Sequence, residues 1–195
     1  PKIIERVLDR SSLLARKRAG SDRSAQAIAA NVDYVLLVQS CNADFNPRRL
    51  ERYIVAVAES GAEAIVVLNK ADLDESSQFS YAAVTTHRVS ALTGEGLESL
   101  SPYLQAGRTA VLVGSSGVGK STLVNRLSGG AHQSTQSVRE GDDKGRHTTT
   151  SRQMIFVEGG GMIIDTPGMR EFGLLEADTE GSGLFDDIAH LAAQC

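Results

Sequence analysis

Short apolar runs alternate with segments of helical spacing along the middle of the chain. Residues 33–38 and 64–68 are apolar runs of the length that buried strands have. Between them, apolar residues recur at helical spacing from Pro47 to Gly61, and proline and glycine are typical of the helix ends at which they stand. Because a strand, a helix and a strand follow one another at these lengths, we expect a parallel βαβ unit with both sheet faces covered.

The same kind of pattern continues to residue 164. Further strands are predicted at 84–89, 109–113, 154–157 and 162–164, and further helices at 97–104 and 121–127. Residues 3–14 predict one or two strands. Residues 133–146 are polar and contain glycines, and their number is typical of a functional loop rather than of a tight connection.

A glycine-rich stretch connects the strand at 109–113 to the helix at 121–127. It consists of Gly114, Ser115, Ser116, Gly117, Val118, Gly119, Lys120 and Ser121, followed by Thr122. Glycines let backbone N–H groups converge on phosphates, and the start of a helix adds positive potential. Lys120 is predicted to reach the β- and γ-phosphates, and the Ser121 hydroxyl to bind Mg²⁺. A glycine-rich loop that binds nothing does not account for Lys-Ser at this offset.

A second motif follows the strand at 64–68 directly and reads Asn69, Lys70, Ala71, Asp72. In an NKxD loop the aspartate accepts hydrogen bonds from N1–H and the 2-amino group of guanine, whereas adenine offers no such donors. Four residues of this kind alone would be read as a surface turn. At the carboxyl end of a strand, in a chain with a phosphate loop, they predict guanine recognition.

A third segment, Ser90, Ala91 and Leu92, follows the strand at 84–89. It fits a loop that lines guanine, in which a backbone N–H meets the base carbonyl. Without the motif at 69–72, an ordinary strand exit would be the better interpretation.

Two further segments are expected to contact Mg²⁺ and the γ-phosphate. Thr148 or Thr149, in the stretch 146–150, is predicted to complete the Mg²⁺ coordination. Asp165 begins a D-x-x-G motif and is predicted to bind Mg²⁺ through water, while the N–H of Gly168 senses the γ-phosphate. Both segments therefore depend on the phosphate that hydrolysis removes.

Composition and charge narrow the class of protein. The chain has 195 residues, of which 41% are hydrophobic and 23% charged, as in ordinary globular domains. Its net charge of −4 argues against general coating of nucleic acid. Residues 1–23 nevertheless carry seven basic and three acidic side chains. The basic run 16–18 is either a solvated loop, which we slightly favour, or a contact to a phosphate backbone.

The remaining features concern the compartment and the extent of the chain. Its two cysteines, Cys41 and Cys195, make no disulfide framework, which favours a reducing cytosol. No apolar run is long enough to span a membrane. The first residues begin in the middle of a pattern, so we expect a piece of a longer protein.

The order of the motifs is unusual. In ordinary small GTPases the phosphate loop comes first and the guanine-recognising loops last, whereas here NKAD and SAL precede GSSGVGKS, HTTT and DTPG. Circular permutation of this kind is tolerated when the joined ends lie close together. With GSSGVGKSTLVN, GRHTTT, DTPGMREFGL and residues 29–33, the chain resembles the circularly permuted small-ribosomal-subunit biogenesis GTPases of the RsgA (YjeQ) type.

The resemblance implies a fold, an activity and partners. The fold would be an α/β P-loop NTPase three-layer sandwich with a circularly permuted, mostly parallel sheet. The activity would be hydrolysis of GTP to GDP and phosphate with Mg²⁺, stimulated by the ribosome, in late maturation of the small (30S) subunit in the cytoplasm. The partners would be that subunit and its rRNA, with no membrane and a monomeric chain.

The resemblance also implies a division into domains. Residues 1–22 would be the tail of an N-terminal OB-type domain and a linker, residues 23–175 the GTPase domain, and residues 176–195 the start of a C-terminal zinc-binding domain. Cys195 would stand at the first Zn²⁺-ligand position, and the other ligands are not in this sequence.

The group that activates water is left open by the sequence. Where other GTPases carry a glutamine after D-x-x-G, this chain has Met169, which cannot orient water. His147 is a candidate catalytic residue beside the predicted Mg²⁺-binding threonines, and a simple loop cap is equally consistent with its position.

Two alternatives to the small-subunit function are a GTPase of large-subunit assembly and a non-catalytic guanine-nucleotide switch. The first is disfavoured because Ser116 and Gly117 replace the Pro-Asn of a GxPNVGKS loop.

Overall fold

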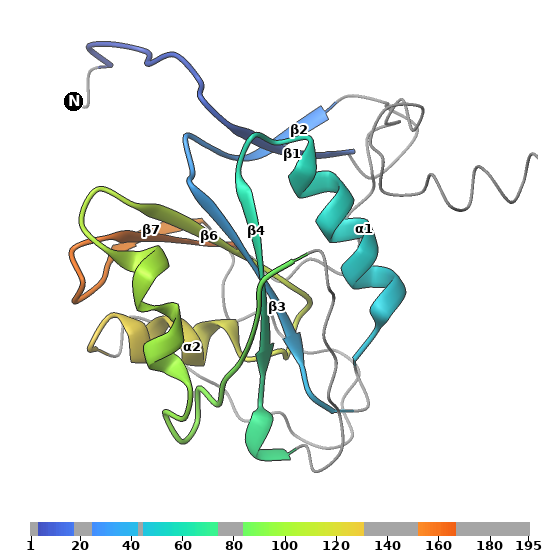
Figure 1. The fold of residues 1–195 in the computed structure, drawn as a ribbon. Coiled ribbons are helices and arrows are strands. Elements are labelled where there is room, and N and C mark those ends of the chain that lie inside the picture. Colours follow the sequence, from blue (N-terminus) through green and yellow to red (C-terminus); the bar gives the residue numbers. More distant parts are fainter. Residues whose placement is uncertain (1–3, 18–24, 43–44, 74–83, 131–151, 167–195) are drawn as a thin grey trace, which may run out of the picture.

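A six-stranded sheet forms the centre of the computed structural model (Figure 1). The structure describes residues 4–17, 25–42, 45–73, 84–130 and 152–166. The strand order is β5-β4-β3-β6-β8-β7, with β3 (Tyr34–Ser40), β4 (Glu63–Asn69), β5 (Thr86–Arg88), β6 (Thr109–Val113), β7 (Gln153–Phe156) and β8 (Met162–Asp165). All neighbouring strands are parallel except β7 and β8. The expectation of a mostly parallel α/β sheet is therefore confirmed.

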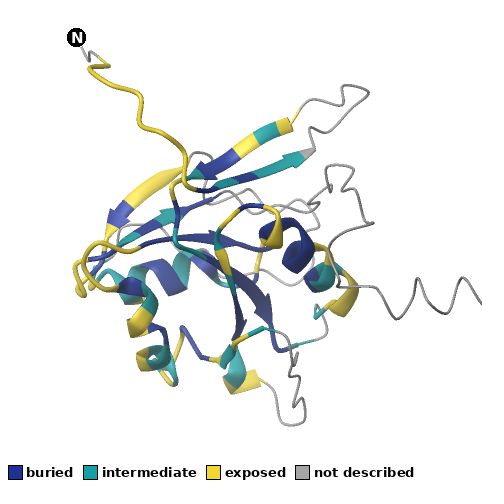
Figure 2. Cartoon of the chain, turned by 45° about the horizontal axis from the view of Figure 1, so that its top comes forward, coloured by how far each residue is buried: buried dark blue, intermediate teal, exposed yellow. Residues whose placement is uncertain are grey.

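Helices cover both faces of this sheet and complete three layers (Figure 1). The helix α1 (Pro47–Ala58) packs with Val35, Leu37 and Val66 on one face. The 3₁₀ helix η2 (Leu97–Leu104) and the helix α2 (Lys120–Leu127) cover the other face. Because parallel strands are buried on both sides, the central ones are continuous apolar runs, coloured as buried in Figure 2.

The βαβ unit forms as its sequence predicts. The side chain of Asn46 caps α1 by accepting a hydrogen bond of 3.0 Å from the Arg49 N–H, and Pro47 occupies the first turn. Leu50 and Tyr53 are at most 1% exposed against the sheet, and such burial stabilises by about 1.5–3 kcal/mol for each side chain. The chain then returns in β4, parallel to β3.

The β7–β8 hairpin turns through the three glycines that the sequence indicates. A Cβ on Gly161 would lie 2.5 Å from the backbone oxygen of Leu104, and the Gly161 N–H donates to that same oxygen at 3.1 Å. The turn is therefore held against the end of η2, and only glycine allows so close an approach.

Two details differ from the sequence-based expectations. The segment 97–104 is a 3₁₀ helix rather than a regular α-helix, because Pro102 lies inside it and supplies no N–H. The segment 84–89 contains only the three-residue strand β5.

A two-stranded ribbon precedes the main sheet. In it β1 (Leu13–Lys17) pairs antiparallel with β2 (Ala25–Ala30), and β2 was not predicted. The solvated-loop interpretation of the basic run is wrong for Arg16 and Lys17, which lie in β1. Arg16 donates through Nε to the Gln26 side-chain oxygen at 3.2 Å, so this charge is held by its neighbouring strand.

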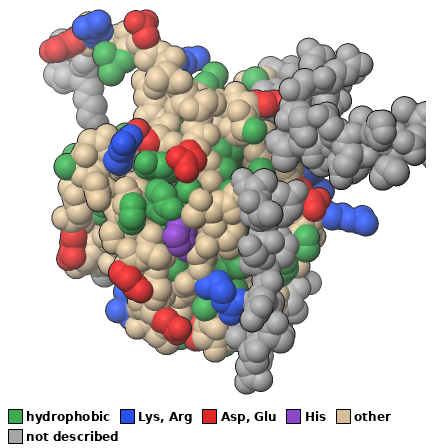
Figure 3. All heavy atoms as spheres, in the orientation of Figure 1, with side chains coloured by type: hydrophobic (Ala, Val, Ile, Leu, Met, Phe, Trp, Pro, Cys, Tyr) green, Lys and Arg blue, Asp and Glu red, His purple; other side chains and the backbone are tan. Residues whose placement is uncertain are grey.

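Over the described ranges, no helix is long and apolar enough to cross a membrane. On the face that Figure 3 displays, acidic and basic side chains are interspersed among polar and apolar ones. Mixed charge of this kind is typical of an ordinary solvated surface.

Candidate nucleotide-binding site

The predicted site residues lie where the sheet changes its direction of winding. From β3 the chain crosses through α1 on one face to β4, and from β6 it crosses through α2 on the other face. Ligands in open α/β sheets bind beyond the carboxyl ends of the strands at such a point. Asn69 ends β4, Gly114 follows β6 and Asp165 ends β8 at this edge.

The glycine-rich loop between β6 and α2 packs closely on its neighbours. A Cβ on Gly114 would lie 2.4 Å from the backbone oxygen of Val38, and one on Gly119 would lie 2.3 Å from Nδ2 of Asn69. Gly119 also has a φ of 92° and Gly117 one of 82°, a left-handed conformation that side chains other than glycine rarely adopt. The glycines at 114 and 119 are therefore required by close contacts, and the one at 117 by its backbone angle.

Lys120 lies at the first turn of α2 and is 7% exposed. Its Nζ donates to the backbone oxygens of Gly114 at 2.9 Å and Ser115 at 2.8 Å. An ammonium group has three N–H donors, so a third can serve a phosphate oxygen. Burial lowers the pKa of Lys120 to about 8, while the negative charge of Asp165 acts in the opposite direction.

Asn69 connects three segments of the site. This side chain is 1% exposed, its Nδ2 donates to the backbone oxygen of Val118 at 2.8 Å, and its Oδ1 accepts from the Ala91 N–H at 2.9 Å. The NKAD loop, the phosphate loop and the SAL loop are thus fixed to one another by a single amide group.

Asp72, the predicted guanine-recognising residue, lies in η1 (Ala71–Leu73) and is exposed. The Ser90 hydroxyl donates to its Oδ1 at 2.5 Å, and the same hydroxyl accepts from the Thr93 N–H at 3.1 Å. Lys70, two residues earlier, has a φ of 62°, and the Ala71 N–H donates to the Val89 oxygen at 3.1 Å. The carboxylate is therefore oriented by the SAL loop while it faces solvent.

Arg126 contributes to this edge although the sequence analysis did not single it out. From the last turn of α2, its Nε donates to the Ala91 oxygen at 3.1 Å and its Nη2 to the Leu92 oxygen at 2.5 Å. Leu92 itself is 69% exposed. Only the folded arrangement could reveal this contact, because 34 residues separate Arg126 from Leu92.

Oxygen ligands suited to Mg²⁺ occur on two neighbouring elements. Asp165 is fully buried at the end of β8, where it pairs with Leu112 of β6. Thr166 donates its hydroxyl to the Leu112 oxygen at 2.6 Å and so fixes the chain just after Asp165. Ser121 follows Lys120 in the first turn of α2. A carboxylate and a hydroxyl fit the oxygen preference of Mg²⁺.

Several predicted site residues fall outside the described residues, namely His147, Thr148, Thr149, Gly168 and Cys195. Of the others, Ser116 and Gly117 are exposed at the tip of the phosphate loop and Thr122 is half-buried in α2. In the described ranges, no group of three or more His, Cys, Asp or Glu residues is placed to hold a metal ion.

Comparison with known sequences finds close relatives. The family model described as RsgA GTPase matches residues 7–175. The small ribosomal subunit biogenesis GTPase RsgA of Xanthomonas campestris is 46% identical over 202 residues, which cover 100% of this chain and 56% of that protein. RsgA 2 of Lactiplantibacillus plantarum is 48% identical over 199 residues, covering 98% and 56% respectively. The chain thus spans little more than half the length of these relatives.

Solved structures with the same fold agree. YjeQ from Thermotoga maritima matches with a TM-score of 0.60 and 29% identity, covering 88% of this chain and 56% of that one. YloQ, described as a circularly permuted GTPase, matches with a TM-score of 0.58 and 21% identity, covering 98% of this chain and 68% of that one. The permuted fold expected from the motif order is therefore confirmed. Since the family model covers most of the sequence and relatives are nearly half identical to it, the chain belongs to the RsgA GTPase family.

Proposed function

We propose that this chain binds GTP and GDP and hydrolyses GTP to GDP and phosphate during maturation of the small ribosomal subunit in the cytoplasm. The observation that carries the proposal is the pair of hydrogen bonds of the Asn69 side chain, one donated to the Val118 oxygen and one accepted from the Ala91 N–H. It holds a phosphate-type loop and two guanine-type loops at one edge of the sheet, as a single guanine-nucleotide site requires. The names of the relatives supply the biological setting.

The phosphate end of the nucleotide would lie in the loop 114–121. Backbone N–H groups and the start of α2 supply positive potential there, and Lys120 adds an ammonium group already held by two carbonyls. Because the side chain is held in advance, little conformational entropy is lost when phosphate binds.

Ser121 and Asp165, with Thr148 or Thr149, would hold Mg²⁺. The ion would neutralise charge that develops on the phosphate oxygens during hydrolysis. Asp165 also provides a negative charge that favours the protonated form of Lys120.

The base would be recognised by Asp72. Its carboxylate accepts from the Ser90 hydroxyl and has further lone pairs for the N1–H and 2-amino donors of guanine. Adenine offers neither donor, so the site is expected to favour guanine nucleotides.

Met169 stands where a glutamine would orient the attacking water, so we propose that His147, next in sequence to the predicted Mg²⁺-binding threonines, activates this water; a cap of its loop is the alternative role. Single-turnover hydrolysis by the His147→Ala variant, with and without the small subunit, tests this assignment. We expect the stimulated rate to fall by at least tenfold, and an unchanged stimulated rate would dismiss the role.

The extent and partners of the protein follow from the same proposal. Residues 1–22 would belong to an OB-type domain and linker, residues 23–175 to the GTPase domain, and residues 176–195 to a zinc-binding domain in which Cys195 is the first ligand. rRNA of the small subunit would be the nucleic-acid partner, with the chain acting as a monomer.

The proposal is tested by measuring both binding and turnover. Calorimetry with GDP, GTP and ADP in the presence of Mg²⁺ is expected to give tight binding for the first two only. GTP turnover is measured with purified small subunits and, separately, with purified large subunits. We expect it to rise with the small subunit and not with the large one. Equal binding of ADP would refute guanine recognition, and stimulation only by the large subunit would assign the chain to the other assembly pathway.

A further inference from the structure

We propose that Arg126 is a positioning residue that fixes the SAL loop (Ser90, Ala91 and Leu92) in its guanine-binding conformation. It also connects that loop to α2, the helix that begins at the phosphate loop. The proposal rests on the guanine-nucleotide site proposed above. It concerns a side chain that none of the predicted motifs includes.

The geometry begins with two consecutive peptide units. Arg126 donates to the carbonyl oxygens of Ala91 and Leu92 at 3.1 and 2.5 Å. A peptide unit is planar, and in its trans form the N–H points away from the C=O. Fixing the Ala91 carbonyl therefore fixes the direction of the Leu92 N–H, and fixing the Leu92 carbonyl fixes that of the Thr93 N–H.

The second of these units leads to the predicted base-recognising carboxylate. The Thr93 N–H donates to the Ser90 hydroxyl at 3.1 Å, and that hydroxyl donates to Asp72. Arg126, Leu92–Thr93, Ser90 and Asp72 thus form one continuous chain of hydrogen bonds. If the guanidinium is removed, the Leu92–Thr93 unit can rotate, and the orientation of Asp72 loses its support.

The loop is held from two sides. Asn69 accepts from the Ala91 N–H on one side, and Arg126 donates to the Ala91 oxygen on the other. Asn69 is buried whereas Arg126 is exposed. The fold of the loop can therefore survive without Arg126, while its orientation becomes less restricted.

Arg126 also connects the two halves of the nucleotide site through a rigid element. It lies in the last turn of α2, and Lys120 lies in the first turn of the same eight-residue helix. The planar guanidinium of arginine can donate to two neighbouring acceptors at once, whereas the ammonium group of lysine lacks this fixed two-donor geometry. A shift of α2 at its phosphate end would therefore move the support of the base loop.

This arrangement predicts a selective effect on base recognition. Hydrogen bonds from a charged donor are stronger than neutral ones, but exposure to solvent weakens them. We expect Arg126→Ala to weaken Mg-GDP binding about tenfold, which corresponds to about 1.4 kcal/mol. Binding of inorganic tripolyphosphate, which has no base, is expected to change by less than about twofold.

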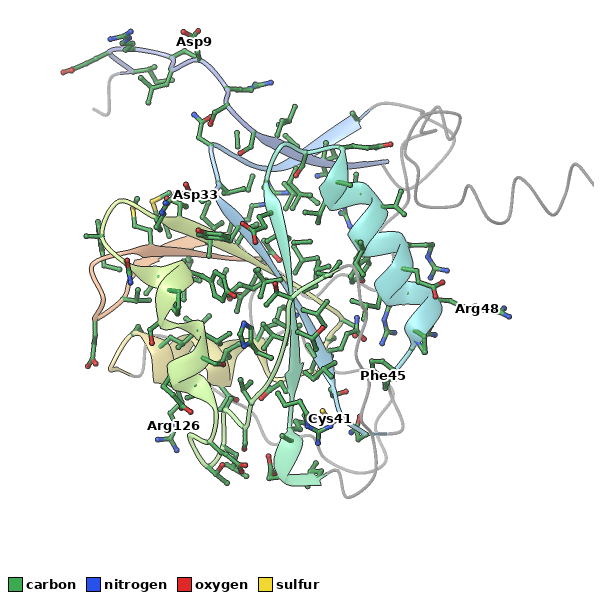
Figure 4. The ribbon with its side chains drawn as sticks, in the orientation of Figure 1. Asp9, Asp33, Cys41, Phe45, Arg48 and Arg126 are labelled. Carbon is green, nitrogen blue, oxygen red and sulfur yellow. The ribbon has the colours of Figure 1, made fainter. Side chains whose placement is uncertain are left out.

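The experiment compares wild type, Arg126→Ala and Arg126→Lys by calorimetry with GDP and with tripolyphosphate, and measures the KM and kcat for GTP. Arg108→Ala is the matched control, because Arg108 is an exposed arginine that pairs with Asp33 at 3.0 Å. Figure 4 shows Asp33 well away from Arg126, towards the other end of the main sheet. We expect KM to rise with kcat unchanged for Arg126→Ala, an intermediate value for Arg126→Lys and no change for Arg108→Ala.

Two results would overturn the inference. An unchanged GDP affinity for Arg126→Ala would show that the contact does not orient the loop. An equal loss of GDP and tripolyphosphate affinity would show that the substitution acts on the whole fold or on the phosphate loop. If wild type bound tripolyphosphate but not GDP, the proposed guanine site itself would fail, which is a separate outcome.

Discussion

Replacement of Asn69 tests whether one buried amide holds the site together. In Asn69→Ala both hydrogen bonds of the side chain are lost, and the Val118 carbonyl and Ala91 N–H are left without this partner. Asn69→Asp is the sharper variant. This variant keeps an acceptor for the Ala91 N–H. It also places a carboxylate oxygen against the Val118 oxygen, to which Nδ2 of Asn69 donates at 2.8 Å in the wild type.

The magnitude follows from burial. Each lost hydrogen bond costs about 1 kcal/mol net, and a stranded buried group costs about 1–3 kcal/mol unless water reaches it. We therefore expect Asn69→Ala to lower the free energy of unfolding by roughly 2–4 kcal/mol, a large part of the 5–15 kcal/mol typical of a domain. The melting temperature would fall by roughly 5–15 °C.

For Asn69→Asp the loss should depend on pH. Burial raises the pKa of the introduced carboxyl above the ordinary value of about 3.9. A group whose pKa is raised by folding contributes stability at low pH and loses it as the pH rises through the folded-state pKa. The deficit against wild type is therefore expected to be largest at pH 7 and to shrink towards pH 5.

Urea denaturation followed by circular dichroism measures these differences at each pH. Asn46→Asp is the control, because it introduces the same charge at an exposed helix cap where aspartate is equally favoured. A loss below about 0.5 kcal/mol for Asn69→Ala, or a deficit of Asn69→Asp that does not depend on pH, would refute the reasoning.

Three further predictions concern charge and close packing. Burial lowers the pKa of Lys120 to about 8 in the free chain, and only the ammonium form attracts phosphate. Raising the pH from 7 to 9 is therefore expected to weaken GDP binding about tenfold in calorimetry. The Lys120→Ala variant should lack this pH dependence. Gly114→Ala is expected to destabilise the fold by about 1–3 kcal/mol in urea denaturation, since its Cβ would lie 2.4 Å from the Val38 oxygen; an unchanged midpoint would contradict this. A hydrogen bond from the Thr109 N–H holds the pKa of Asp33 below its ordinary value of 3.8, so its contribution to stability is present at neutral pH and is lost as the pH falls through the folded-state pKa. Asp33→Asn should therefore lower the melting temperature at pH 7, with a difference from wild type that narrows below pH 3.8.

The sequence predicted the elements that bury a regular apolar pattern. The runs at 64–68 and 109–113 became β4 and β6, and the helix beginning at Pro47 became α1. Each carries its own signal, a run of apolar residues or a pair of helix ends, which does not depend on the rest of the chain.

The elements that the sequence missed depend on contacts made elsewhere. In β2, alanine occupies four of six positions, so its alternation is weak, and it forms because β1 pairs with it. The segment 97–104 has helical spacing, yet Pro102 and the surrounding packing make it a 3₁₀ helix.

The candidate site shows the same division. The motifs indicated Lys120, Asn69 and Asp72 as residues of one nucleotide site. Sequence spacing could not predict that Asn69 bridges two other loops or that Arg126 donates to the SAL loop. These partners lie 22 to 49 residues apart in the sequence.

The strand order also has a consequence for how the protein assembles as it is synthesised. Of the strands in the six-stranded sheet, β3 is made first, β4 and β5 then follow along one side of it, and β6 follows along the other side, before the β7–β8 pair. Among the described strands of this sheet, none has to enter between two that are already paired, so each newly made strand can pair with an open edge. An intermediate that ends after β5 still exposes the flank of β3 until β6 leaves the ribosome. We expect that flank to be the surface on which a nascent chain of this protein is most prone to aggregate.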